Sequence, residues 1–87
     1  MYLHLGNDCA VISSDIIGIF DMDNTTVSSK TRAFLAKAQK NDEIKDVSED
    51  LPKSFIVACE YGKNSVYVSS VATRTLIKRA KSENINI

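Results

Sequence analysis

The stretch Asp15-Ile-Ile-Gly-Ile-Phe-Asp-Met-Asp-Asn-Thr-Thr26 joins an apolar run to a cluster of short polar side chains. The run Ile16–Phe20 is apolar on successive residues. This pattern is typical of a strand covered on both faces, here by the core on one side and by a helix or a neighbouring subunit on the other. Asp, Asn and Thr are common in helix caps and turns. The stretch therefore predicts a buried strand that leads through a turn into a helix.

The residues before this stretch predict a β-hairpin. Tyr2–Leu5 alternates as a short strand does, and Cys9–Ile12 is suited to the return strand. Gly6–Asp8 lies between them and supplies turn residues, since Gly and Asn tolerate positive φ angles. Ser13–Asp15 is a second polar break, which separates the hairpin from the strand Ile16–Phe20.

The residues after the stretch predict an amphipathic helix. Its stripe recurs with helical spacing and consists of Val27, Thr31, Phe34, Leu35 and Ala38. Four residues could cap its start by accepting a hydrogen bond from an unpaired backbone N–H, namely Asn24, Thr25, Thr26 and Ser28.

A second hairpin follows the helix. The acidic segment 41–52 predicts a loop with a short strand near Ile44–Val47. Phe55–Cys59 is again apolar on successive residues, which predicts a strand covered on both faces. The turn residues Tyr61–Asn64 lead into the return strand Val66–Val68.

The chain ends in a short predicted helix, which Thr73 caps and whose buried side is Leu76, Ile77 and Ala80. The order of elements predicts an α+β fold. It is a small single domain of β-hairpins with one central amphipathic helix and a short C-terminal helix. We expect the domain to span residues 1–81 and residues 82–87 to form a frayed tail.

Charge is balanced overall but segregated along the chain. Eleven Lys and Arg residues cancel eleven Asp and Glu residues, so the net charge gives no indication of nucleic acid. Five acidic residues lie between Asp42 and Asp50, whereas four basic residues and no acidic one lie between Arg74 and Lys81. We therefore expect surfaces of opposite sign, for which a solvated surface is the simplest interpretation.

Several classes of protein are disfavoured by the composition. Cys9 and Cys59 are too few for a disulfide framework, which favours free thiols in a reducing compartment. His4 is the only histidine, so a histidine-based metal site or a catalytic triad lacks its parts. The chain has neither a signal-peptide pattern nor the roughly 20 apolar residues that span a bilayer. We expect a soluble, cytoplasmic protein without a cofactor.

One enzymatic interpretation concerns the polar cluster after the first buried strand. A strand followed by Asp-x-Asp-x-Thr resembles the nucleophile motif of haloacid-dehalogenase-type phosphatases, here Asp21, Asp23 and Thr25. That chemistry also needs Mg²⁺, further acidic ligands and a phosphate-binding lysine. The later strand Phe55–Cys59 ends without an acidic pair, and 87 residues cannot build the parallel doubly wound domain that would position those groups. A phosphatase therefore stays a remote alternative, because a strand-to-helix turn explains the same residues.

Six stretches between residue 1 and about residue 80 carry a more extensive similarity. They are Met1–Gly6, Asp15–Asp21 with Asn24–Thr26, Leu51–Phe55, Ser69–Ser70 and Thr75–Ala80. In these stretches the chain resembles the RemA/RemB family of small bacterial extracellular-matrix regulators, and it is more similar to the RemB branch. The resemblance implies a non-catalytic cytoplasmic protein that activates biofilm-matrix genes.

The resemblance also implies partners. The RemA branch binds DNA as a closed ring of identical subunits through arginines arrayed around the ring. A homo-oligomer and double-stranded DNA are therefore the expected partners, and neither a membrane nor a small-molecule substrate is expected. In this chain Leu51-Pro52 stands where the RemA branch carries an arginine pair, and Asp15 replaces another of its basic residues.

Other basic residues are therefore the candidates for DNA binding, namely Lys53, Arg74, Lys78 and Arg79. DNA affinity comes mainly from neutralised phosphates, and a repeated subunit multiplies the effect of each cation. The alternative is an oligomeric scaffold or protein-interaction module that does not bind DNA.

Overall fold

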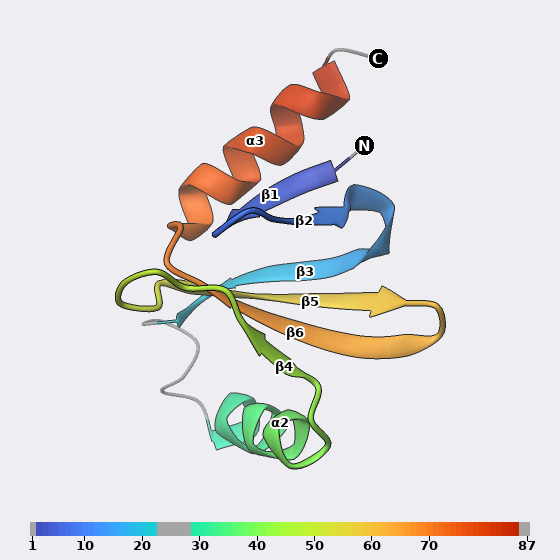
Figure 1. Cartoon of the computed structure of the whole chain (residues 1–87), viewed down its shortest axis with the longest axis vertical. Helices are drawn as coiled ribbons and strands as arrows, with labels where there is room; N and C mark the ends of the chain where they lie inside the picture. The colour runs from blue at the N-terminus through green and yellow to red at the C-terminus, as the bar shows by residue number, and fades with distance from the viewer. Residues whose placement is uncertain (1, 23–28, 86–87) are drawn as a thin grey trace.

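The computed structural model of the chain describes residues 2–22 and 29–85, with side chains up to Lys81. The fold is α+β, which confirms the predicted class (Figure 1). The elements are β1 (Tyr2–Gly6), β2 (Cys9–Ile12), the short 3-10 turn η1 (Ser13–Asp15), β3 (Ile16–Asp21), α2 (Ser29–Lys40), β4 (Ile44–Asp46), β5 (Ser54–Glu60), β6 (Lys63–Ser69) and α3 (Thr73–Ile85). The predicted boundary between domain and tail after Lys81 stays a prediction. No helix in the described ranges is long and apolar enough to cross a membrane.

The strands form two sheets. β1 and β2 make an antiparallel two-stranded hairpin, as predicted. The other sheet has the order β3-β5-β6-β4, in which β5 pairs antiparallel with both β3 and β6. The short strand β4 pairs parallel to β6 at the far edge. The sheet is thus mixed and not the parallel, doubly wound kind.

Both hairpins close through two-residue turns with positive φ angles. Asn7 and Asp8 have φ angles of 49° and 59°, and Gly6 pairs with Cys9 across the turn. Tyr61 and Gly62 have φ angles of 54° and 78°. Such turns match the right-handed twist of the strands and favour Asn, Asp or Gly. Tyr61 is therefore an unusual residue at its position.

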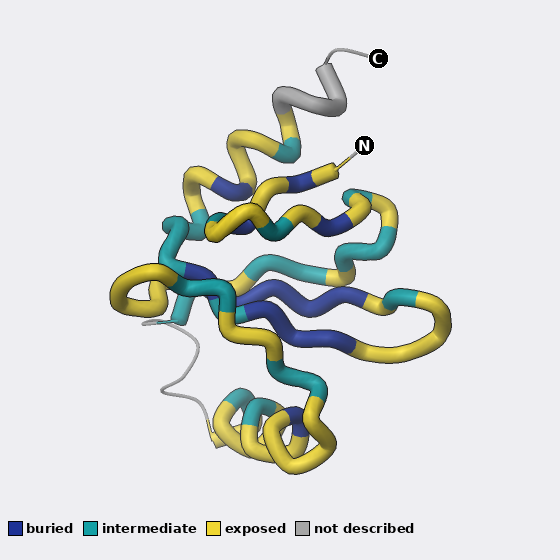
Figure 2. The backbone as a smooth tube through the Cα atoms, in the orientation of Figure 1, coloured by how far each residue is buried: buried dark blue, intermediate teal, exposed yellow. Residues whose placement is uncertain are grey.

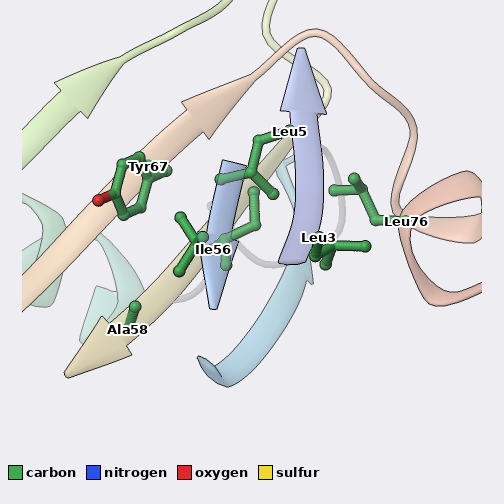
Figure 3. Packing of buried hydrophobic residues seen from close by; sticks show 7 residues of the cluster. Leu3, Leu5, Ile56, Ala58, Tyr67 and Leu76 are labelled. Carbon is green, nitrogen blue, oxygen red and sulfur yellow. The ribbon is translucent and has the colours of Figure 1, made fainter. Parts of the chain in front are cut away.

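β5 lies at the centre of three layers. Its even-numbered residues pack with the β1–β2 hairpin and α3 in one core cluster, which includes Leu3, Leu5 and Leu76 (Figure 3). Its odd-numbered residues, Phe55 and Val57, pack against α2. Residues 54–58 are therefore buried without interruption (Figure 2). The prediction of a strand covered on both faces is confirmed for Phe55–Ala58, whereas Cys59 at the end of the predicted run is exposed.

β3 is covered less completely than predicted. Within the chain only one of its faces is covered, because α2 packs mainly over β5 and β6 and leaves part of the edge strand open. Ile17 is 65% exposed and Phe20 is 38% exposed. A helix of the same subunit therefore covers the second face of β3 only in part, and cover by a neighbouring subunit, the other expected alternative, stays a prediction.

The two helices differ from expectation in their details. The four candidate caps of α2 and Val27 lie outside the described residues. Among the described residues of the stripe only Ala38 is buried, while Phe34 is 43% exposed. In α3, Leu76 is buried as predicted but Ile77 is 39% exposed, because the helix lies over the edge of the core. Thr73 is the first residue of α3, and its buried Oγ1 has no hydrogen-bond partner among the described residues, so the predicted cap is wrong.

Candidate nucleic-acid interface

The exposed side of α3 is basic. Arg74, Lys78 and Lys81 recur at intervals of four and three residues, which places them on one helix face, and all three are exposed. No acidic residue lies between Thr73 and Lys81. Because Leu76 faces the core from the opposite side, packing directs this basic face toward solvent.

Lys53 lies beside the segment that leads into α3. Its backbone N–H donates to the Ser69 carbonyl at 2.8 Å, and its own carbonyl accepts from the Met22 N–H at 2.9 Å. These bonds fix the backbone of Lys53 against the end of β6, while its side chain is exposed. The fold thus brings Lys53 to the same edge of the molecule as the first turn of α3.

A pair of buried serines sets where α3 begins. Ser54 and Ser69 face each other across β5 and β6, and both are 0% exposed. Ser54 Oγ donates to the Val71 carbonyl at 2.8 Å, and Ser69 Oγ accepts from the Val71 N–H at 3.0 Å. Ser69 Oγ also donates to the carbonyl of Leu5 in β1. The two hydroxyls therefore bind both backbone groups of a residue just before α3.

Arg79 faces a different neighbour from the other predicted residues. Its Nη1 donates to the backbone carbonyl of His4 at 3.0 Å, which ties α3 to β1. Lys53, Arg74 and Lys78 are therefore exposed, and Arg74 and Lys78 share one face of α3, whereas Arg79 is also engaged in holding the helix to the hairpin. Sequence reasoning missed this tie because it joins residues 75 positions apart.

A second polar cluster lies where β4, β5 and β6 meet. Tyr67 Oη donates to Glu60 Oε1 at 2.6 Å, and Lys45 Nζ donates to Tyr67 Oη at 3.4 Å and lies 5.2 Å from the ring centroid. Burial, followed by the hydrogen bond to Glu60, raises the pKa of Tyr67 above its ordinary range. Burial also raises the pKa of the nearby Cys9 thiol, which lowers its thiolate fraction at neutral pH.

Of the phosphatase-like motif, only Asp21 lies within the described residues. It pairs with Ser54 at the end of β3, in a sheet whose β3–β5 pairing is antiparallel. Asp23 and Thr25 lie outside the described residues. Among residues 2–22 and 29–85, no group of three His, Cys, Asp or Glu side chains is placed to hold a metal ion.

Comparison with known proteins agrees with the resemblance found in the sequence. Extracellular matrix regulatory protein B of Bacillus subtilis strain 168 is 38% identical to the chain over 81 residues. The similar region covers 93% of this chain and 91% of the relative. No protein-family model matches the chain.

Proposed function

Because the chain belongs to the extracellular matrix regulatory protein B family, we propose that it regulates extracellular-matrix genes by binding double-stranded DNA as a homo-oligomer. It would act in the cytoplasm and without catalysis, on genes of the biofilm matrix. The relative's name supports regulation of the matrix. DNA binding and self-assembly are our inferences.

The exposed basic face of α3 is the observation that carries the proposal. Arg74 and Lys78 point away from the core, and the backbone bonds of Lys53 hold it beside the start of the helix. Regularly spaced cations on a rigid element can neutralise successive phosphates and release their counterions. We assign phosphate binding to Lys53, Arg74 and Lys78, with Arg79 contributing both its charge and its bond to His4.

Assembly supplies what one subunit lacks. The net charge of the chain is zero, so a single copy offers only a small basic surface. Linked copies bind with an affinity well above that of one copy when their surfaces engage the same ligand together. A homo-oligomer, such as a closed ring, would therefore make duplex binding effective with few cations per subunit.

Duplex binding at several salt concentrations tests the proposal. We expect affinity to fall steeply as salt rises, and the salt slope of a variant to be smaller by about 1 for each phosphate that it no longer neutralises. Arg74→Ala and Lys78→Ala should each weaken binding. Lys63→Ala is the matched control, since it removes an exposed lysine at the start of β6, next to the β5–β6 turn. A salt-independent affinity, or equal losses in all three variants, would contradict the proposal.

An oligomeric scaffold or protein-interaction module is the second candidate. Leu51 is 75% exposed and occupies a position where the RemA branch carries basic residues. An exposed leucine favours a protein partner over phosphate. Assembly without duplex binding at low salt would support this function over the first. Phosphatase activity would instead appear as magnesium-dependent phosphate release that Asp21→Asn abolishes, and we expect none.

A further inference from the structure

An apolar groove lies between β3 and α2. Phe55 and Val57 of β5 form its floor, and Ile17, Phe20 and Phe34 form its walls. The groove encloses about 350 Å³. Its walls are more than one-third exposed, although they are large apolar side chains. An exposed apolar patch of this kind on a small domain indicates an interaction site.

Local features of β3 build this groove. Phe20 stacks on Phe55 with 5.0 Å between ring centroids and 18° between ring planes. A Cβ at Gly18 would come within 2.7 Å of the Phe20 ring, so only glycine leaves room for the ring at this position. The register between β3 and β5 shifts between Ile16 and Gly18, and Ile17 is the extra residue at that irregularity.

The loop of residues 48–52, hereafter the 48–52 loop, presents the complementary feature. Both of its ends are fixed to β6, because the Val47 N–H donates to the Val68 carbonyl and the Lys53 N–H donates to the Ser69 carbonyl. The loop projects from the sheet between β4 and β5 (Figure 1). Leu51 is 75% exposed on it.

Charge makes the groove and the loop complementary. α2 carries four basic residues and no acidic one, and Lys30 lies at the groove itself. The segment Asp46–Asp50 carries three acidic residues and no basic one, and it directly precedes Leu51. An apolar side chain preceded by carboxylates, and followed by Lys53 two residues later, thus has a matching apolar groove with the ammonium group of Lys30 beside it. Such complementarity steers encounter and disfavours wrong partners.

We infer that the 48–52 loop of one subunit docks on a second copy of this chain, with Leu51 in the β3–α2 groove and Glu49 near Lys30. The inference rests on the proposed self-assembly and names the surfaces that make it. The loop and the groove are different parts of the surface, so the contact is heterologous. Each bound subunit still offers one free loop and one free groove, and repetition gives a ring or a filament.

Two single variants of the full chain test this contact by their size in solution, measured by light scattering after size-exclusion chromatography. Leu51→Asp disables the loop, and Phe34→Asp disables the groove. Both side chains are exposed, so the fold should persist, which circular dichroism checks. We expect each variant to associate about tenfold or more weakly than the wild type, as when a central apolar anchor is removed.

Mixing the two variants gives the decisive measurement. In a heterologous contact the mixture retains one intact loop and one intact groove, so it forms a heterodimer that grows no further. A mixture that stays monomeric while the wild type assembles would indicate a symmetric interface and overturn the inference. Variants that assemble as the wild type does would overturn the docking arrangement but leave the proposed assembly intact. A monomeric wild type would refute both, before any variant is compared.

Charge reversal and a matched control complete the test. Lys30→Glu and Glu49→Lys should each weaken association, and the double variant should recover part of it. Tyr61→Asn is the control, because Tyr61 is 100% exposed but lies at the β5–β6 turn. Its assembly should equal that of the wild type. If Tyr61→Asn disrupts assembly and Leu51→Asp does not, the hairpin tip occupies the groove and the inference fails.

Discussion

Replacing Ser69 by alanine should destabilise the protein far more than replacing its neighbour Ser70. Ser69 is 0% exposed, and its hydroxyl joins three parts of the chain. From the end of β6 it donates to the Leu5 carbonyl and accepts from the Val71 N–H. The variant removes both bonds and leaves the two backbone groups without this partner in a low-dielectric environment.

The size of the effect follows from these two bonds. Each hydrogen bond contributes about 1 kcal/mol net, and a buried polar group left unpaired costs roughly 1–3 kcal/mol. We expect Ser69→Ala to lower the free energy of unfolding by about 2–4 kcal/mol. This is a large part of the total free energy of unfolding of a domain, which is only about 5–15 kcal/mol. Ser54→Ala removes one bond, to the Val71 carbonyl, and should cost about 1 kcal/mol.

Urea unfolding followed by circular dichroism measures these differences. Ser70→Ala is the control, since this serine only accepts a long bond of 3.4 Å from the Glu49 N–H, and its cost should stay within about 0.5 kcal/mol. Amide exchange at Val71 should accelerate in Ser69→Ala, because that N–H loses its acceptor. If Ser69→Ala is as stable as Ser70→Ala, the serine pair does not hold the start of α3 and the reasoning is refuted.

Three further predictions concern individual side chains. Arg79→Ala should lower the free energy of unfolding by about 1 kcal/mol because the bond to His4 is removed. Lys78→Ala should instead weaken duplex binding and leave thermal unfolding unchanged. If the Arg79→Ala and Lys78→Ala variants have equal melting temperatures, Arg79 does not hold α3 to β1. The pKa of Tyr67 is raised above its ordinary 10.0, so the folded state resists ionisation and stability should fall as pH rises above about 10. Tyr67→Phe should reduce this fall in unfolding measurements over alkaline pH, and an unchanged slope would rule out Tyr67 as a source. Tyr61→Asn should raise stability by about 1 kcal/mol, because asparagine tolerates a φ angle of 54° better than tyrosine; a less stable variant in urea unfolding would show that Tyr61 makes a compensating interaction.

The proposed assembly contact and the proposed DNA contact use different elements of the fold. The groove and the 48–52 loop use α2, β3 and the acidic segment, whereas Arg74 and Lys78, which we assign to phosphate binding, belong to α3. Lys53 directly follows the loop, so Lys78 is the residue that distinguishes the two proposals. A loss of assembly should therefore weaken duplex binding through reduced multivalency, while Lys78→Ala should weaken it with assembly intact. Measuring size and duplex binding on the same variants distinguishes these effects.

Local patterns in the chain were enough to predict the α+β class, both hairpins and the doubly covered strand β5. Turn residues such as Asn7 and Asp8 act through their own backbone preferences. The apolar run Phe55–Cys59 predicts a strand, and residues 55–58 of it are buried. The family, too, follows from the order of residues along the chain, and the comparison confirms it. These features depend on neighbours in sequence, so a single sequence carries them.

Other features arise only when distant segments meet. The pairing of Ser54 with Ser69, the bond from Arg79 to His4 and the exposure of Ile17 depend on which strands become neighbours and on how much of β3 the helix α2 covers. An apolar run looks the same on a central strand and on an edge strand, because burial is a property of the layer above the strand. The basic face of α3 and the β3–α2 groove were therefore composed of residues visible in the sequence, but packing decided which of their side chains face solvent.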